Sequence, residues 1–201
     1  MGSFKLPALP AACEWLNSPA DWKTWGDDSL AVASGGKTDW FIDPAGDSVT
    51  FNAPAALFTP PDESCLLSAK VSVSFASAFD AGVLLAAAGE DLWAKVCFEY
   101  SPQGRPMVVS VVTRGASDDC NSTLIEGGEV YLRVAVMRKS LAFHYSLDGR
   151  FWNLVRYFSL GAVPGLRLGF LSQSPTGDGC SAVFTGIRYA AGELKDIRNG
   201  E

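Results

Sequence analysis

One short segment of the sequence, LWAKVCFEY (residues 92–100), places two opposite charges inside an apolar run. If this segment is a β-strand, its period of two puts Trp93, Lys95, Cys97 and Glu99 on one face. An unpaired charge buried on that face would be strongly destabilising. We therefore predict that the face is solvated, supplied with partners, or both, while the intervening apolar residues face the core.

Glu99 and Lys95 suggest acid–base chemistry, but they need partners from other segments. At a strand rise of about 3.3 Å per residue, their Cα atoms lie roughly 13 Å apart. The candidate partners with charged side chains are Arg114, Asp118, Arg133 and Arg156.

Glycoside hydrolysis needs two carboxyls, about 5–5.5 Å apart in retaining enzymes and about 6.5–9.5 Å apart in inverting ones. The face of residues 93–99 carries only the carboxyl of Glu99, and nothing in the sequence places Asp39 or Asp118 near it. The sequence thus favours a binding protein over an enzyme, and it assigns no catalytic residue.

A second segment, GGKTDWF (residues 35–41), could contribute to the same site. Sugar sites combine an aromatic ring with carboxylates and amides that bind hydroxyl groups. Trp40 or Trp93, together with Asp39, Lys95 and Glu99, would fit this description. The alternative is that these tryptophans are simply core residues.

Other catalytic schemes have little support. His144 is the only histidine, and strand alternation makes it either a solvated residue or part of a cleft. A thiol–imidazole pair would require Cys97 beside His144, and a structural cysteine is the commoner case. The sequence has no phosphate loop, dinucleotide fingerprint or metal-ligand spacing, so we expect no cofactor and no metal.

Short strand-like runs separated by Gly, Pro, Asp and Ser recur along the chain, and no amphipathic helix is evident. In VYLRVAVMR (residues 130–138), Val130, Leu132, Val134 and Val136 alternate with residues that face the other way. We expect a single domain, residues 1–201, built as an all-β sandwich of two antiparallel sheets or jelly roll. The twelve expected strands are Ser29–Ala33, Trp40–Ile42, Ser48–Asn52, Leu66–Phe75, Gly82–Ala87, Leu92–Glu99, Met107–Thr113, Val130–Met137, Leu141–Ser146, Leu154–Ser159, Leu166–Leu171 and Ala182–Tyr189.

Composition excludes some partners. The net charge is −6 and the basic residues are scattered singly, which disfavours nucleic acid and anionic membranes. The N-terminal segment lacks an apolar stretch of signal-peptide length, and five widely spaced cysteines favour reduced thiols. We therefore expect a cytoplasmic location.

Five segments, in a fixed order from Trp15 to Tyr189, carry a resemblance to a known family. They are CEWLNSPADW, LAVASGGKTDWF, FDAGVLLAAAGEDLWAKVCFEY, VVSVVTRGASDD and GLRLGFLSQSPTGDGCSAVFTGIRY. Together they resemble the regulation-of-enolase-like family, a family of unknown function in the concanavalin A-like lectin/glucanase superfamily. The resemblance implies a concanavalin A-like jelly roll with a concave sheet face, on which residues 93–99 would form the floor of a cleft.

The sequence departs from the pattern of that family at two places. Ala78-Phe79-Asp80-Ala81-Gly82 stands where the family commonly reads Tyr-Asp-Gln-Ala-Gly, and Asp119 stands where a Trp is usual. These changes remove a polar side chain and an aromatic ring near the expected cleft.

The leading hypothesis is a non-catalytic cytoplasmic domain that binds a small polar, carbohydrate-like ligand in a concave cleft. The alternatives are a sugar-active enzyme with Glu99 as acid or base, and a regulatory domain whose partner is a metabolic enzyme. The expected ligand-binding residues are Trp93, Lys95, Glu99, Asp39, Trp40, Arg114, Asp118 and Arg156.

Overall fold

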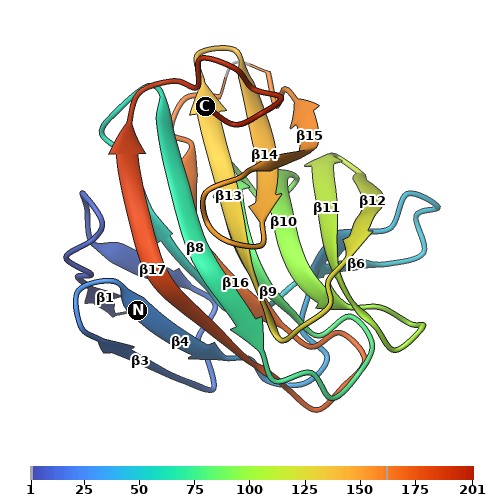
Figure 1. The fold of residues 1–201 in the computed structure, drawn as a ribbon. Coiled ribbons are helices and arrows are strands. Elements are labelled where there is room, and N and C mark those ends of the chain that lie inside the picture. The colour runs from blue at the N-terminus through green and yellow to red at the C-terminus, as the bar shows by residue number, and fades with distance from the viewer. Residues whose placement is uncertain (1, 162) are drawn as a thin grey trace.

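The computed structural model describes residues 2–161 and 163–201, and these form strands, turns and loops without a helix. Two large antiparallel sheets pack face to face (Figure 1). In spatial order, the eight-stranded sheet contains β1 (Ser3–Phe4), β2 (Cys13–Leu16), β7 (Ala55–Phe58), β16 (Arg167–Gln173), β9 (Ala81–Ala87), β10 (Leu92–Tyr100), β11 (Pro106–Arg114) and β12 (Ser117–Leu124). The seven-stranded sheet contains β15 (Asn153–Phe158), β14 (Ser140–Ser146), β13 (Glu129–Met137), β8 (Cys65–Val73), β17 (Ser181–Ala191), β4 (Ser29–Ala33) and β3 (Asp21–Trp25).

The core between the two sheets follows from strand alternation. Val96 and Phe98 of β10 are fully buried in it, as are Leu132 and Val134 of β13. The predicted alternation of residues 130–136 is therefore confirmed, and so is the all-β jelly-roll sandwich of two antiparallel sheets.

A second apolar cluster lies on the face of the eight-stranded sheet that is turned away from the core, which we call its outer face. Trp93, Cys97 and Val109 belong to this cluster and are buried. A small two-stranded sheet of β5 (Trp40–Ile42) and β6 (Val49–Phe51) contributes Trp40 to it. The outer face beside Lys95 is thus covered by chain, not open to water.

All twelve expected strands are present, with bounds that differ from the expected ones by no more than two residues. Five further strands, β1, β2, β3, β7 and β12, were not expected from the sequence. Three of them lie at sheet edges, where strands need fewer apolar residues: β1 and β12 in the eight-stranded sheet, and β3 in the seven-stranded sheet.

Among the described residues, no helix is long and apolar enough to cross a membrane.

Candidate functional site

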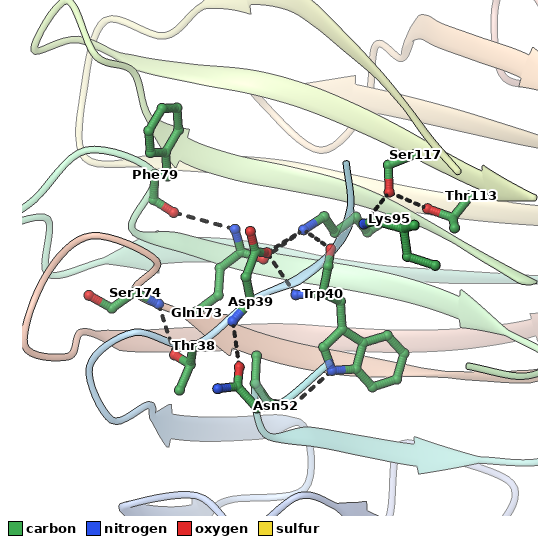
Figure 2. Close-up of polar contacts among 12 residues, drawn as sticks. Thr38, Asp39, Trp40, Asn52, Phe79, Lys95, Thr113, Ser117, Gln173 and Ser174 are labelled. Atoms are coloured by element: carbon green, nitrogen blue, oxygen red, sulfur yellow. Dashed lines mark hydrogen bonds and ion pairs between the residues drawn. The ribbon is translucent and has the colours of Figure 1, made fainter. Parts of the chain in front are cut away.

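Lys95 is the centre of the polar network on the outer face of the eight-stranded sheet. Its side chain is 2% exposed, and its Nζ forms an ion pair with Asp39 Oδ1 at 2.8 Å. The same Nζ donates to the backbone carbonyl of Trp40 at 2.7 Å and to Gln173 Oε1 at 2.8 Å. Figure 2 shows the three acceptors converging on the ammonium. An ammonium has three N–H donors, so Lys95 has none left for a ligand.

The loop before β5 is built to present its acceptors to Lys95. The Asp39 amide donates to Asn52 Oδ1 at 2.9 Å, and the Trp40 amide donates to Asp39 Oδ1 at 2.7 Å. The Trp40 indole is fully buried and donates to the Ala53 carbonyl at 3.0 Å. Asp39 is therefore held in place before it meets the cation, which limits the entropy lost in forming the pair.

Glu99 lies on the same face of β10 but in a different electrostatic environment. It is only 8% exposed. Within residues 2–161 and 163–201 no group forms a hydrogen bond with its carboxyl, whose oxygens keep some contact with solvent in the cavity described below. Burial raises the pKa of Glu99 to about 8, because desolvation outweighs the attraction of Lys95. At neutral pH this carboxyl is mostly protonated and can both donate and accept a hydrogen bond.

Asp119 brings another carboxyl to the site from β12. Lys95 registers with Val111 of β11, and Val111 registers with Asp119, so the three residues form one row across the sheet. Burial raises the pKa of Asp119, and the charge of Asp119 raises that of Glu99. The aromatic residue that the family resemblance led us to expect is here replaced by an acid that faces the site.

These groups line a cavity of about 310 Å³, which we call the Glu99 cavity. Its polar lining includes Asp39, Lys95, Glu99, Asp119 and Gln173. Its remaining lining residues are Phe41, Phe79, Val111, Pro175 and Thr176. This volume and this mixture of apolar and polar groups are typical of small-molecule sites.

Phe79 is held at the cavity by an uncommon backbone conformation. Its φ is +70°, a region that non-glycine residues rarely adopt. The Phe79 amide donates to the Tyr100 carbonyl at 2.7 Å, and its carbonyl accepts from Gln173 Nε2 at 3.4 Å. Such strained residues are concentrated at ligand sites, where their surroundings over-determine them.

The structure divides the eight expected site residues into three groups. Lys95, Glu99 and Asp39 come together at the Glu99 cavity. Trp93 and Trp40 are fully buried in the apolar cluster beneath it, and Lys95 Nζ lies 5.6 Å from the ring centroid of Trp93. The remaining three, Arg114, Asp118 and Arg156, lie outside the lining of the cavity.

Arg114, Asp118 and Arg156 join the two sheets at one edge of the sandwich. Arg156 Nη2 of β15 pairs with Asp118 Oδ1 of β12 at 2.9 Å. Arg114 Nη1 donates to the Ser159 carbonyl at 2.8 Å. Strand alternation explains the separation from the site, because Asp118 and Asp119 point to opposite faces of β12.

His144 and Cys97 cannot act together. His144 lies on the outer face of the seven-stranded sheet and Cys97 on the outer face of the eight-stranded sheet. His144 is fully buried, and its Nε2 lies 2.7 Å from the Ile197 carbonyl. The expectation of a solvated strand histidine is therefore wrong, because the segment around Ile197 covers it.

Comparison with known proteins places the chain in a family. The family model described as "Protein of unknown function (DUF1349)" matches residues 15–191. The chain belongs to this family. That description does not include the narrower regulation-of-enolase-like name, which stays a prediction. No curated protein matches the chain.

Solved structures share the fold. A functionally unknown protein from Saccharomyces cerevisiae is 22% identical, with a TM-score of 0.79 over 90% of this chain and 96% of that one. A xylan β-1,4-xylosidase from Bacillus halodurans is 11% identical, with a TM-score of 0.62; the match covers 86% of this chain but only 38% of the xylosidase. An alginate lyase from Klebsiella pneumoniae is 12% identical, with a TM-score of 0.54 over 82% and 81% of the two chains. At these identities the likeness shows the fold alone.

Proposed function

We propose that this protein is a non-catalytic, cytoplasmic binding domain whose Glu99 cavity takes a small neutral ligand rich in hydroxyl groups, such as a sugar. The observation that carries the proposal is the Glu99 carboxyl, which is 8% exposed and without a partner among the described residues, in a cavity of about 310 Å³. Burial raises the pKa of this carboxyl to about 8, which favours its protonated form at neutral pH. The carboxyl oxygens of Glu99 are not among the fully buried polar atoms that lack a partner, so they are open to the cavity, where a ligand hydroxyl can bind them.

The charge of the cavity supports a neutral ligand over an ionic one. Lys95 is saturated by Asp39, Trp40 and Gln173, so it cannot bind an anion directly. A neutral Glu99 does not attract a cation, and burial raises the pKa of Asp119, which disfavours a negative charge there as well. In this proposal Lys95 is a positioning residue, because it fixes Asp39 and Gln173 and keeps one face of the cavity rigid.

The aromatic lining supports a sugar ring. Phe41 and Phe79 line the cavity beside the polar groups, and both are partly exposed. Aromatic faces contact the apolar C–H face of a pyranose, while carboxyls and amides bind its hydroxyls. The expected aromatic platform of Trp40 or Trp93 is thus replaced by phenylalanines, since both tryptophans are buried.

The structural neighbours are consistent with this ligand class. Two of them are named for action on the polysaccharides xylan and alginate. The chain spans only 38% of the xylosidase, so the activity of that protein does not transfer with the fold.

A glycan array that includes xylan and alginate oligosaccharides, followed by calorimetry on the glycans that bind, tests the proposal. We expect Glu99→Ala to weaken binding by about tenfold or more, because the hydrogen bond between Glu99 and the ligand is lost and the shape of the cavity wall changes. Glu99→Gln keeps a donor and an acceptor and should bind within a few-fold of the wild type. Asp118→Ala is the control and should bind like the wild type, since Asp118 lies outside the lining of the cavity and faces the opposite side of β12 from Asp119. If no glycan binds, or if Glu99→Ala binds as tightly as the wild type, the proposal is wrong.

A specific observation also favours a second function, that of a sugar-active enzyme. A buried carboxyl with a pKa of about 8 is protonated as a general acid must be, and Asp119 lies in the same cavity. Glu99→Gln separates the two functions, because it would retain glycan binding and abolish turnover. Reducing-sugar release from a bound oligosaccharide by the wild type, lost in Glu99→Gln, would establish the enzyme.

A further inference from the structure

A second buried cation, Arg133, lies on the outer face of the seven-stranded sheet, on the opposite side of the sandwich from the Glu99 cavity. It is only 6% exposed. Arg133 of β13 registers with His144 of β14 and with Ser68 of β8, and Ser68 registers with Arg188 of β17. The four residues therefore form one row across four neighbouring strands of the sheet.

A β-bulge brings Arg188 into this row. The register between β17 and β8 shifts between Thr185 and Arg188, so β17 has one more residue there than β8. Gly186 has a φ of +57° at this point. The bulge turns Ile187 into the core, where it is 1% exposed, and turns Arg188 outward. Without it, an isoleucine would lie opposite Ser68.

Arg133 has few partners for a buried cation. Its Nη2 donates to the Gly200 carbonyl at 3.0 Å, and its Cζ lies 4.1 Å from the ring centroid of Trp152. Its Nε is buried without a hydrogen-bond partner among the described residues. Within residues 2–161 and 163–201, no carboxylate lies within 4.0 Å of its charged nitrogens. Burial without a counter-ion lowers the pKa of Arg133 to about 10, so the guanidinium stays charged at neutral pH.

The surroundings of Arg133 form a cavity of about 420 Å³, which we call the Arg133 cavity. Its charged lining consists of Arg133, Arg150, Arg188 and Asp148. Asp148 Oδ1 already accepts from the amides of Arg150 and Phe151, at 2.8 and 2.9 Å, and from the Ser146 hydroxyl. The cavity therefore has three guanidinium groups and one carboxylate, whose Oδ1 is used by its own turn, so the charge of its lining is positive overall.

We propose that the Arg133 cavity binds a small ligand through an oxyanion, a carboxylate or a phosphate group. Guanidinium groups bind such oxyanions in a bidentate manner, and the contact between Arg133 Cζ and the Trp152 ring helps to hold the guanidinium in place. The oxyanion would supply the counter-charge that the protein provides for Lys95 but does not provide for Arg133. The site is on the other outer face, so it does not depend on the sugar ligand proposed above.

His144 gives a direct readout, because it is the only histidine of the chain and the cross-strand neighbour of Arg133. We would titrate the protein with inorganic phosphate and, separately, with succinate, at constant ionic strength set by sodium chloride. The imidazole resonances of His144 and the indole resonance of Trp152 report the site. Calorimetry gives the affinity.

We expect saturable shifts with at least one of the two anions. Arg188→Ala should weaken binding by about tenfold or more, and Arg133→Lys should weaken it as well, because an ammonium cannot form the bidentate contact. Arg105→Ala, an exposed arginine in the turn between β10 and β11, is the control and should bind like the wild type. Binding of phosphate alone or of succinate alone identifies the oxyanion.

Two results would overturn the proposal. One is that neither anion shifts His144 or Trp152 at millimolar concentration. The other is that Arg188→Ala and Arg105→Ala reduce binding equally, which would mean a general charge effect. If Arg133→Lys does not fold, the affinity of Arg188→Ala still tests the proposal, because Arg188 is exposed.

Discussion

The two outer faces of the sandwich each bury a cation, and they treat it in opposite ways. Lys95 on the eight-stranded sheet has three acceptors, one of which is the carboxylate of Asp39. Arg133 on the seven-stranded sheet has one backbone carbonyl and an aromatic ring. Both residues stand mid-strand and point away from the core, so alternation alone does not distinguish them.

Under the two binding proposals, this difference determines what each face would bind. Where the protein supplies the counter-charge, the cation becomes part of the scaffold, and the neighbouring carboxyls are left to bind neutral groups. Where the protein does not supply it, the cation is available to a ligand that carries the opposite charge. A buried charge is thus evidence of an ion site only after its internal partners have been counted.

Replacing the buried cation of each face with methionine should give the largest contrast in stability between the two faces. Lys95→Met leaves the Asp39 carboxylate, the Gln173 carbonyl and the Trp40 carbonyl without their donor. Breaking one side of a buried pair costs about 3–5 kcal/mol. Urea denaturation should show a loss of this size, whereas a loss below about 1 kcal/mol would mean that Asp39 is solvated without Lys95.

Glu99 should make stability depend on pH in an unusual direction for a carboxyl. Its pKa is raised from 4.5 to about 8, so the folded protein keeps a proton that the unfolded chain releases near pH 4.5. Stability should therefore fall as pH rises from about 4.5 to about 8, by at most about 1.4 kcal/mol per pH unit, and Asp119 acts in the same direction. Denaturation of the wild type and of Glu99→Gln across this range measures the effect. Identical slopes for the two proteins would contradict the assignment.

Arg133→Met should be milder than Lys95→Met. It removes one hydrogen bond and one cation–π contact and leaves no carboxylate unpaired, so we expect a loss of about 1–2 kcal/mol. The measurement is again urea denaturation, in buffer without phosphate. A loss as large as that of Lys95→Met would show that Arg133 is mainly structural.

The exposed ion pair at the sandwich edge should matter least. The Asp118 side chain is 61% exposed in its contact with Arg156. Asp118→Asn should therefore change stability by less than about 1 kcal/mol, and this small change should vanish in high salt. A larger loss would mean that this edge contact holds the sheets together.

The sequence predicts the parts of the fold that depend on local pattern. Runs such as residues 130–136 alternate over several residues, and packing of one face against the other sheet confirms them. β12 was not expected because SDDCNSTL has few apolar residues, and it pairs on one side only, at the edge of its sheet. β7 is a four-residue, alanine-rich strand, AALF, and alanine has a low β-propensity. Burial on both faces stabilises the strand, and the sequence of the segment alone does not indicate that burial.

The candidate site was only partly predictable for a similar reason. Period two puts Lys95 and Glu99 on one face, but only the tertiary structure shows that the loop of Asp39 folds over them. Gln173, Phe41 and Phe79 carry no motif, and they reach the cavity through strand order and a positive φ. Strand alternation puts Asp119 on the same face as Ser117, so Asp119 can be assigned to the outer face once that segment is recognised as a strand. Only their charge suggests Arg114, Asp118 and Arg156 as site residues, and charge does not specify a face.

The β5–β6 hairpin has a consequence for motion. Within the described part of the chain, neither strand pairs with a strand of a large sheet. Its polar ties to the eight-stranded sheet include the bond from Lys95 to the Trp40 carbonyl and the bond from the Ile42 amide to Ser117 Oγ, at 2.9 Å. Because the hairpin lies outside both large sheets, we expect it to open locally without global unfolding, so its amides should exchange with solvent faster than those of β10. Because Asp39 and Phe41 line the Glu99 cavity, the frequency of this local opening would set how fast a ligand enters and leaves.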